Sequence, residues 1–435
     1  MNIILLSGGS GTRLWPLSND IRSKQFIHLF KNSGGDYESM VQRVYRQITS
    51  VDSEAQLTVA TSKSQVSAIK NQLEDKVSVC VEPCRRNTFP AILLAALFLK
   101  YKKNVSDDEC VVVCPVDPYV TDEYYEAIKN LEILVNGSDS NILLLGIEPD
   151  TPSDKYGYII PESKGGISKV REFKEKPDIK TAEEYINRGA LWNAGVFAFK
   201  LGYVIKKAHE YIDFTDYDDL YSKYDTLTSI SFDYAIVEKE SNIRVMRFAG
   251  DWKDVGTWNM LSEVMSDKAK GNVMMDDTCE NTNVVNELDI PILCMGCKDM
   301  IVAASSDGIL VSDKEQSGYI KTYVEKMTGE ARYAEKSWGT YTVIDAHSDS
   351  LTVKVMLNAG NRMKYHSHER RDEVWTVVSG TGRTIIDDEE KTFKPGDVVS
   401  IKAGQKHTII ADTDITVIEV QIGKDISKDD KRIWQ

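Results

Sequence analysis

A glycine-rich segment near the N-terminus carries residue types that suit phosphate binding. It follows an apolar run at 2–6, and its key residues are Gly8, Gly9, Gly11, Thr12 and Arg13. Glycines let the backbone turn sharply and expose N–H groups to an anion, and an arginine offers a fork of donors to phosphate oxygens. The spacing excludes a P-loop, which needs Gly-Lys-Ser/Thr, and a dinucleotide fingerprint, because Leu14 stands at the third glycine position. We therefore predict a polyphosphate-binding loop of another kind; the alternative is an ordinary glycine turn.

A second group of chemically active residues lies near the C-terminus. Three of the chain's six histidines, His366, His368 and His407, occur there together with Glu373. Histidines at i and i+2 of a strand point to the same side, so both can reach one ion. Three imidazoles and a carboxylate suit a divalent transition metal such as Zn²⁺, Mn²⁺, Fe²⁺, Co²⁺ or Ni²⁺. We predict a metal site here; the alternative is an exposed His-Ser-His turn.

The elements that must position the glycine loop alternate in type over residues 1–260. Strands are expected at 57–60, 77–81, 111–114 and 142–145, and helices at 40–48, 90–101 and 123–135. Such alternation predicts a mostly parallel sheet covered on both faces. Ligands in these folds bind at the carboxyl ends of the strands, which is where the glycine loop begins.

The elements change character further along the chain. Between about 270 and 325 the helices stop, and short strands such as 300–303 and 308–311 predict a β-rich connector. From 337 onward, strands separated by Gly, Asn or Asp turns predict a small barrel or jelly roll. These strands are expected at 341–344, 351–357, 373–378, 383–386, 397–401 and 416–421. We predict domains at residues 1–265, 266–330 and 331–435.

The overall composition limits the possible functions. A formal charge of −14 and a pI near 5.1 argue against nucleic acid or an anionic membrane as the main partner. The longest apolar stretch, 91–99, is about half the length of a membrane span. The seven cysteines form no secretory framework, and Cys294 and Cys297 lack the second pair expected of a zinc site. A cytoplasmic protein that binds neither nucleic acid nor membrane is expected.

The glycine loop resembles the signature of the sugar-phosphate nucleotidyltransferases, in the form carried by mannose-1-phosphate guanylyltransferases, Gly-Gly-x-Gly-Thr-Arg-Leu-Trp-Pro-Leu-Ser. Further segments resemble this family in order through about residue 330. They are 24–26, 82–88, 115–117, 155–159, 173–177, 192–197, 231–238 and 252–258. The family implies an α/β fold, a Rossmann-like nucleotidyltransferase domain with a mixed sheet of the GT-A-like type. Two positions depart from its pattern: Ser23 replaces a proline and Pro118 replaces a histidine.

The resemblance implies a role for each group of residues. Nucleotide binding is implied for Gly8, Gly9, Gly11, Thr12, Glu82 and Asn87. Sugar-phosphate binding is implied for Gly157, Glu175, Asn193 and Gly195. Catalytic roles are implied for Arg13, Lys24 and Lys176. Asp117 and Asp254 are implied to hold Mg²⁺, an ion that prefers carboxylate and phosphate oxygens.

The reaction that the resemblance implies is attack of a sugar 1-phosphate oxygen on the α-phosphorus of GTP, which releases pyrophosphate. The second pKa of a phosphate monoester is about 6, so the nucleophile arrives deprotonated and needs no general base. The protein must instead supply in-line positioning and neutralise the developing charge. The expected product is GDP-mannose, and we also expect a homodimer.

The histidine segment resembles the first metal-binding motif of the cupins at each fixed position from Gly360 to Gly380. It is also similar to the C-terminal isomerase domain of the type II bifunctional phosphomannose isomerase/guanylyltransferases, with matches at 371–375 and 418–421. This implies a cupin (jelly-roll) β-barrel that interconverts fructose 6-phosphate and mannose 6-phosphate, with a metal that polarises the reacting oxygens. Arg371 would bind the substrate or stabilise the enediolate. His366 stands where those isomerases have glutamine.

Two other functions also fit the sequence. The first is a guanylyltransferase for another sugar 1-phosphate, such as a heptose, with an inactive cupin domain. The second is a regulator that binds sugar nucleotides without catalysis. The candidate catalytic and metal-binding residues that argue against a regulator are Arg13, Lys24, Asp117, Lys176 and Asp254.

Overall fold

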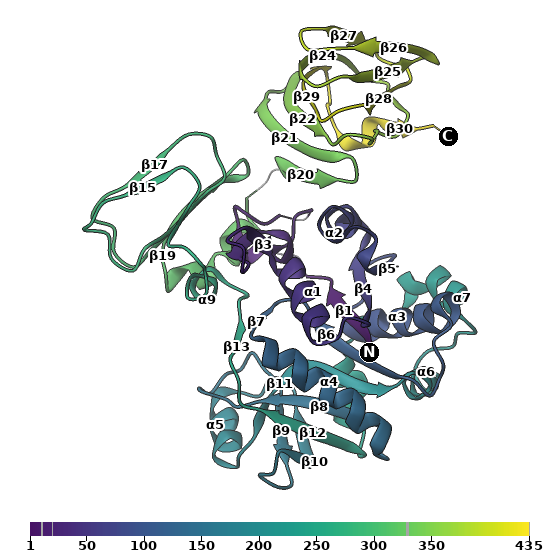
Figure 1. Cartoon of the computed structure of the whole chain (residues 1–435), viewed down its shortest axis with the longest axis vertical. Coiled ribbons are helices and arrows are strands. Elements are labelled where there is room, and N and C mark those ends of the chain that lie inside the picture. Colours follow the sequence, from purple (N-terminus) through teal and green to yellow (C-terminus); the bar gives the residue numbers. More distant parts are fainter. Residues whose placement is uncertain (10–11, 20, 328–329, 435) are drawn as a thin grey trace. The chain divides into compact units, whose positions relative to one another are not determined.

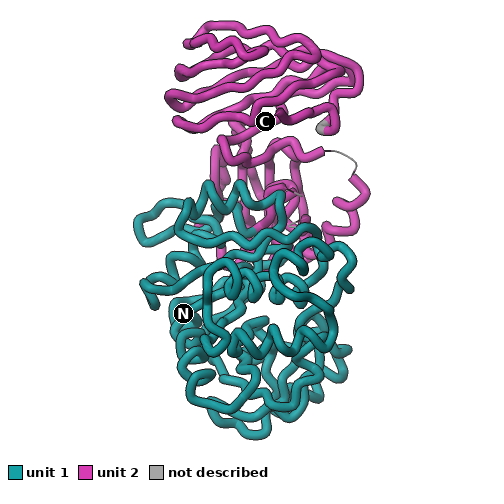
Figure 2. The backbone as a smooth tube through the Cα atoms, turned by 90° about the vertical axis from the view of Figure 1, so that its right-hand side faces the viewer, with its two compact units in different colours: residues 1–9, 25–256 teal, residues 10–24, 257–435 magenta. Residues whose placement is uncertain are grey.

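The computed structural model describes residues 1–9, 12–19, 21–327 and 330–434 (Figure 1). The chain forms two compact units, which Figure 2 shows in different colours. Unit 1 contains Met1–Gly9 and Gln25–Gly256, and unit 2 contains Ser10–Lys24 and Thr257–Gln435. Among the described residues, no helix combines the length and the apolar character needed to cross a membrane.

A nine-stranded sheet forms the centre of unit 1, in the order β5-β4-β1-β6-β11-β8-β12-β10-β9. Its strands are β1 (Asn2–Ser7), β4 (Gln56–Ser62), β5 (Ser78–Glu82), β6 (Cys110–Pro115), β8 (Ile142–Ile147), β9 (Tyr158–Pro161), β10 (Ile167–Lys174), β11 (Leu191–Lys200) and β12 (Ile243–Phe248). Ile3, Ile4 and Leu5 of β1 are all fully buried. Since successive strand residues point to opposite faces, both faces of this sheet are covered, as the sequence predicted.

The direction of the strands divides the sheet into two parts. β5, β4, β1 and β6 run parallel, as the alternation of strands and helices predicted. β11 runs antiparallel to β6, β8 and β9, and β9 and β10 form an antiparallel pair. The sheet is therefore mixed, as the family resemblance implied. The expectation of a mostly parallel sheet holds for the part that contains β1 and for the pair of β8 with β12, but not for the other pairings. Apolar periodicity reports burial and not strand direction, which explains the difference.

The helices of unit 1 follow local sequence signals. They are α1 (Met40–Val51), α2 (Val66–Leu73), α3 (Thr88–Lys103), α4 (Asp122–Gly137), α5 (Ile179–Asn187), α6 (Leu201–Ala208), α7 (Tyr217–Ser222) and α8 (Phe232–Ala235). Ser39 and Gln42 form a reciprocal capping box at the start of α1. In α3, Pro90 lies in the first turn, where its missing N–H costs little, and the left-handed Asn104 ends the helix. Helix α3 is buried in one core with α6 and α8.

Two small strand pairs complete unit 1. β2 (His28–Lys31) pairs with β3 (Tyr37–Ser39), and β7 (Pro118–Val120) pairs with β13 (Trp252–Asp254). The second pair joins the segment after β6 to the end of unit 1.

The longer segment of unit 2, Thr257–Gln435, starts with the helix α9 (Trp258–Ser262), which a β-rich connector follows. Four of its strands form one sheet, β14 (Ala269–Lys270), β16 (Asn283–Asn286), β18 (Met300–Ser305) and β19 (Gly308–Asp313), and β15 (Val273–Met275) pairs with β17 (Ile292–Cys294). The expectation that helices stop until about 325 is wrong at its end, because α10 (Lys321–Val324) is helical. A helix of four residues is too short to produce a detectable period.

The C-terminal part of unit 2 is a cupin-like barrel made of two sheets. The first contains β20 (Tyr333–Lys336), β21 (Gly339–Ala346), β22 (Ser350–Leu357), β29 (Ile415–Gly423), β24 (Arg371–Ser379) and β27 (Val398–Ile401). The second contains β26 (Glu389–Phe393), β25 (Gly382–Ile386), β28 (His407–Ala411), β23 (His366–His368) and β30 (Lys431–Ile433). Val353, Trp375, Ile409 and Val417 from both sheets share one apolar core.

Candidate functional site

The start of the glycine loop is held at the carboxyl end of β1. The Thr61 hydroxyl donates to the carbonyl of Ser7 (3.1 Å), and the Gln65 amide donates to the carbonyl of Gly9 (3.2 Å). Gly8 and Gly9 are exposed there. The predicted Gly11 lies outside the described residues.

Three other predicted residues of this region belong to unit 2 and not to unit 1. They are Thr12, Arg13 and Lys24. Thr12 and Arg13 belong to a short 3-10 helix, η1 (Thr12–Leu14), and the Arg13 side chain is exposed. Their roles stay predictions.

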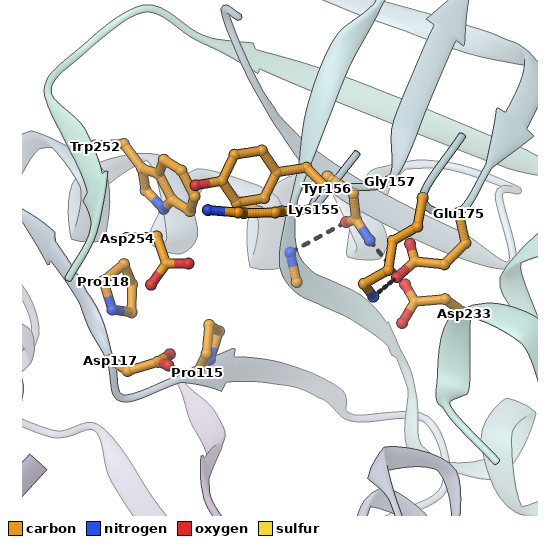
Figure 3. A pocket seen from close by; sticks show the side chains of 14 residues that line it. Pro115, Asp117, Pro118, Lys155, Tyr156, Gly157, Glu175, Asp233, Trp252 and Asp254 are labelled. Atoms are coloured by element: carbon orange, nitrogen blue, oxygen red, sulfur yellow. Dashed lines mark hydrogen bonds and ion pairs between the residues drawn. The ribbon is translucent and has the colours of Figure 1, made fainter. Parts of the chain in front are cut away.

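Unit 1 contains a pocket beside the end of β6 (Figure 3). Its lining comes from several segments that are far apart in the sequence. The predicted residues that line it are Asp117, Gly157, Glu175, Lys176, Asn193, Gly195 and Asp254. Charged, polar and aromatic side chains that line one hollow suit a polar small molecule.

One side of the pocket carries two carboxylates, Asp117 and Asp254. The pairing of β7 with β13 places Asp254 opposite Pro118, the residue that follows Asp117. Figure 3 shows both carboxylates on the side of the pocket away from Glu175. Two carboxylates beside a space that can admit phosphate oxygens form a donor set that suits Mg²⁺.

The opposite side of the pocket is built around Glu175. This residue is buried, and its carboxylate forms an ion pair with the exposed Lys176, whose backbone is left-handed (φ 48°). The ion pair raises the pKa of Lys176 although burial alone would lower it. A Cβ at Gly157 would lie 2.4 Å from Glu175 Oε2, so only glycine leaves room for this carboxylate.

Asp233 is a pocket residue that the sequence did not identify as part of the site. The Asn193 amide donates to Asp233 Oδ1 (2.7 Å), and Asn193 Oδ1 accepts from the backbone of Gly195 (3.1 Å), which is left-handed (φ 70°). Burial, and then the nearby charge of Glu175, raise the pKa of Asp233 to about 7. The segment 231–238 was identified by resemblance, but nothing in its sequence showed that Asp233 on α8 reaches the pocket.

An aromatic wall borders the pocket and was also not among the predicted site residues. The ring of Tyr156 lies 4.7 Å from that of Trp192 and 5.5 Å from that of Trp252. Tyr156 and Trp252 line the pocket, as does Lys155. Trp252 Nε1 is buried and has no acceptor among the described residues. Aromatic faces with one unused donor suit a ligand that has both apolar and hydroxyl surfaces, such as a sugar ring.

The two remaining nucleotide-binding candidates lie outside the pocket lining. Glu82 is buried at the end of β5, accepts a hydrogen bond from the Tyr224 hydroxyl (2.8 Å), and lies 3.7 Å from a Cβ placed on Gly8. Burial raises the pKa of Glu82. Asn87 is left-handed (φ 68°) and caps α3 by accepting from the backbone of Thr88 (2.8 Å). The structure thus brings Glu82 to the glycine loop, whereas the side chain of Asn87 caps the start of α3.

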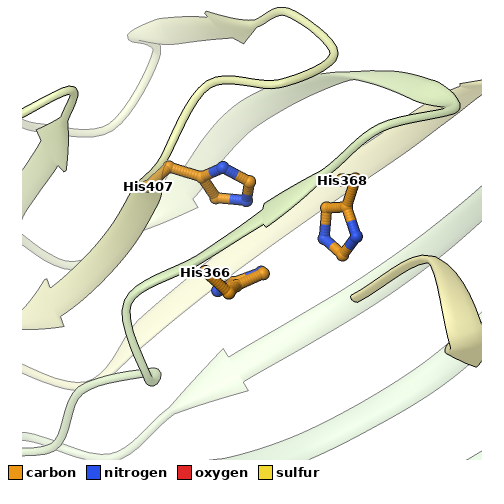
Figure 4. Close-up of side chains that lie close together, drawn as sticks. All are labelled: His366, His368 and His407. Atoms are coloured by element: carbon orange, nitrogen blue, oxygen red, sulfur yellow. The ribbon is translucent and has the colours of Figure 1, made fainter. Parts of the chain in front are cut away.

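The C-terminal barrel brings the three predicted histidines together (Figure 4). His366 lies directly opposite His407 in the pairing of β23 with β28. One ring nitrogen from each of the three histidines can be chosen so that all three nitrogens lie within 4.8 Å of one another. The Nδ1 of each histidine contacts a backbone carbonyl. The partner of His366 is Lys364 (2.7 Å), that of His368 is Asp430 (3.0 Å), and that of His407 is Gln405 (2.9 Å). A carbonyl can only accept, so each Nδ1 carries the proton and each Nε2 presents a lone pair to the interior.

Glu373 completes the predicted donor set. Its Oε1 lies 3.2 Å from His368 Nε2, and its Oε2 lies 3.3 Å from His407 Nε2. The buried His407 Nε2 has no hydrogen-bond donor among the described residues. Lone pairs that face one another at this distance repel unless a cation lies between them, so these residues fit a divalent metal.

The ionisation of this cluster also favours a metal. Burial, and then the charge of Lys431, lower the pKa of His366 to about 2. Burial also lowers the pKa of His368 to about 4, although the charge of Glu373 opposes this shift. Burial opposes ionisation of Glu373, but the guanidinium of Arg371 favours it, and the pKa of Glu373 is lowered overall. Neutral imidazoles and an ionised carboxylate are the forms that bind metals.

Arg371 lies within the same cluster. Its guanidinium donates to His368 Nε2 (3.1 Å), to Glu373 Oε1 (3.2 Å) and to the carbonyl of Ser427 (3.2 Å). The buried Glu419 accepts from Gln421 (2.6 Å), and burial followed by the charge of Glu373 raises the pKa of Glu419. The predicted substrate-binding role of Arg371 stays a prediction.

Comparison with known proteins gives two family matches. Residues 2–271 match the family model described as nucleotidyl transferase. Residues 325–434 match the model described as mannose-6-phosphate isomerase C-terminal.

Individual relatives are similar over almost the whole chain. A mannose-1-phosphate guanylyltransferase of Escherichia coli (strain K12) is 28% identical, with 98% of this chain and 96% of the relative covered. The xanthan biosynthesis protein XanB of Xanthomonas campestris pv. campestris (strain B100) is 29% identical, also with 98% and 96% covered. A crystal structure from Thermus thermophilus, described as mannose-1-phosphate geranyltransferase, is 27% identical, has a TM-score of 0.60, and covers 75% of this chain and 98% of its own.

Proposed function

This chain belongs to the nucleotidyl transferase family, and we propose that it makes GDP-mannose and pyrophosphate from GTP and mannose 1-phosphate. The observation that carries the proposal is the pocket of unit 1, where Asp117 and Asp254 lie across from the Glu175–Lys176 pair. Similarity over almost the full chain to a mannose-1-phosphate guanylyltransferase supports the choice of nucleotide and sugar.

The charges of the pocket suit phosphoryl-type transfer to a phosphate nucleophile. Asp117 and Asp254 would hold Mg²⁺, which neutralises phosphate charge when it is bound. Lys176 is protonated at neutral pH, and its ion pair with Glu175 raises its pKa further. It can therefore orient the sugar phosphate for in-line attack. No general base is required, since a phosphate monoester is already deprotonated at neutral pH. The family resemblance assigns Arg13 and Lys24 to the triphosphate.

The other side of the pocket suits a hexose. Glu175 and Asp233 carry acceptor oxygens for sugar hydroxyls, and the amide of Asn193 fixes one of these oxygens. Tyr156 and Trp252 offer aromatic faces to the apolar surface of the ring. A carboxylate at Glu82, beside Gly8, can accept from the N1–H and amino group of guanine, which adenine does not offer.

A substrate screen tests this assignment. Each of the four common nucleoside triphosphates is combined with mannose 1-phosphate, glucose 1-phosphate and a heptose 1-phosphate, and released pyrophosphate is measured. GTP with mannose 1-phosphate should give the highest kcat/KM. Preference for the heptose would establish the alternative transferase, and no pyrophosphate with any pair would leave the non-catalytic regulator.

For the C-terminal barrel we propose a metal-dependent interconversion of fructose 6-phosphate and mannose 6-phosphate. The three histidines and Glu373, arranged around a shared point, support this second activity. A bound divalent metal would polarise the carbonyl and hydroxyl oxygens of the sugar. The neighbouring carboxyl group of Glu419 and the guanidinium of Arg371 supply hydrogen-bond partners for these oxygens.

The isomerase assay uses the full chain after removal of metals and reloading with Zn²⁺, Mn²⁺, Fe²⁺, Co²⁺ or Ni²⁺ in turn. Formation of mannose 6-phosphate with at least one metal, and its loss in His368→Ala, is expected. No turnover with any metal would refute the isomerase and leave the barrel without this activity.

The finer organisation predicted from the sequence is part of the same proposal. We propose a transferase domain at 1–265, a connector at 266–330 and an isomerase domain at 331–435. The cytoplasmic location and the homodimer stay predictions.

A further inference from the structure

The last strand of the barrel, β30, carries a lysine beside the metal-ligating histidines. β30 pairs antiparallel with β23, and Lys431 lies directly opposite His368. Residues directly opposite in an antiparallel pair point to the same face, with Cβ atoms about 5 Å apart. His368 is buried in the barrel interior, so Lys431 points to that side as well. The next residue, Arg432, lies opposite Ser367 and points to the other face.

The electrostatic neighbours of Lys431 agree with this direction. Its ammonium group interacts with Glu419, Glu373 and Arg371, and it is near enough to His366 to affect that imidazole. The residue as a whole is exposed, unlike the three histidines, but burial is the main cause that lowers the pKa of its ammonium group, so the exposed part is the stem and the ammonium points inward. Within the described part of the chain, the ammonium forms no ion pair as close as those of Arg371.

Arg371 is less suited to bind a further anion. Its side chain is only 9% exposed, and its nitrogens already contact His368, Glu373 and the carbonyl of Ser427. A new anion there would have to displace these contacts. Among the described residues, Lys431 has no comparable set of partners to give up.

The charge around the barrel mouth favours an anion. The cations that interact there are Lys431, Arg371 and Lys336, and the carboxylates are Glu373, Glu419 and Asp430. With a divalent metal at the histidines, positive charge exceeds negative charge even if all three carboxylates are ionised. A phosphate group, with a charge of about −1.5 to −2 at neutral pH, is therefore attracted to this mouth.

We propose that Lys431 binds the phosphate group of a hexose 6-phosphate whose C1 and C2 oxygens lie at the His366, His368 and His407 centre. This inference rests on the isomerase proposed above and identifies the residue that holds its substrate. The phosphate is at the opposite end of the sugar from C1 and C2. A cation one strand away from the metal ligands, and closer to solvent, matches that separation.

Binding of fructose 6-phosphate to the metal-loaded full chain, measured by calorimetry, tests the proposal. Lys431→Ala should weaken this binding by about tenfold or more, because a charge-assisted hydrogen bond is lost, and Lys431→Arg should restore most of it. Arg432→Ala is the matched control, since it removes one positive charge from the same strand on the opposite face, and it should bind as the wild type does. Free fructose, which has no phosphate, should bind Lys431→Ala and wild type equally. Binding at unit 1 is common to all variants and cancels in the comparison.

The outcomes separate this inference from the isomerase. Equal fructose 6-phosphate affinity of Lys431→Ala and wild type, with unchanged metal content and unfolding temperature, would overturn the role of Lys431 even if the isomerase is active. No detectable binding to the metal-loaded wild type would overturn it as well. Lys431-dependent binding without turnover by any metal form would uphold the phosphate site and refute the isomerase alone. If Arg432→Ala weakened binding as much as Lys431→Ala does, the effect of Lys431 would be one of general surface charge. This result would also overturn the inference.

Discussion

Gly157→Ala should damage catalysis while leaving the fold of unit 1 largely intact. A Cβ at this position would lie 2.4 Å from Glu175 Oε2, whereas its distances to Phe173 Cζ (3.2 Å) and Asn193 Cβ (3.3 Å) need shifts of only a few tenths of an ångström. The atom that must move furthest is the end of a flexible side chain. Relief to ordinary contact displaces the Glu175 carboxylate by about 1 Å, a shift that can cost an enzyme about 100-fold in rate. The cost to stability should be about 1 kcal/mol.

The assay is kcat/KM for pyrophosphate release from GTP and mannose 1-phosphate, together with the unfolding temperature. Gly166→Ala is the matched control, because no atom lies within 4 Å of a Cβ placed there. A double-mutant cycle assigns the cause: if Gly157→Ala acts through Glu175, then adding it to Glu175→Ala should cause little further loss. Near-normal kcat/KM in Gly157→Ala, or a full additional loss in the Glu175→Ala background, would refute the reasoning.

Three further predictions concern the two sites. Lys176→Ala should lower turnover by about 100-fold, because Lys176 acts on the sugar phosphate in the transition state. The affinity for GTP, measured by calorimetry, should change by less than about threefold. Near-normal turnover would exclude this role. The pKa of Asp233 is raised to about 7 in the folded state, so the folded state holds more protons than the unfolded state between about pH 4 and 7. Stability of the wild type should therefore fall relative to Asp233→Asn as the pH rises through this range, and parallel pH profiles in denaturant titrations would contradict the shift. Chelation of the barrel metal should lower the unfolding temperature of the barrel in calorimetry. Metal at 100 times its Kd should raise the free energy of unfolding of the barrel by about 2.7 kcal/mol. An equal stabilisation of His368→Ala by metal would show that the ion binds elsewhere.

Residues that are close in the sequence could be predicted to lie together from short segments alone. The histidines at 366 and 368 share a strand, so their common direction follows from the period of a strand alone. Glu175 and Lys176 are adjacent in the sequence, so no long-range pairing is needed for both to line the same pocket, while their ion pair was not predicted. The predicted strands of the parallel part of the sheet, such as β6, were found because a continuous apolar run signals burial on both faces.

The sequence could not reveal contacts that depend on distant pairing. Asp233 reaches the sugar side of the pocket only because Asn193 of β11 lies beside α8. Likewise, Lys431 faces the metal ligands only because β30 pairs with β23, and no local pattern near residue 431 specifies that register. Pocket residues such as Trp252 were within identified motifs, but which of them face a ligand depends on how the segments pack.

By itself the sequence determined the residue types from which the chemistry is predicted: a glycine and arginine loop for phosphate, two aspartates, a Glu-Lys pair, and a histidine set for a metal. These follow from residue types and short spacings, which covalent geometry fixes. The tertiary structure decided which of these groups share a site. It placed Asp117 with Asp254 through the pairing of β7 with β13, and it added Asp233 and Lys431 to sites that the motifs had outlined. Such long-range pairings depend on the packing of the whole fold, which local propensity does not encode.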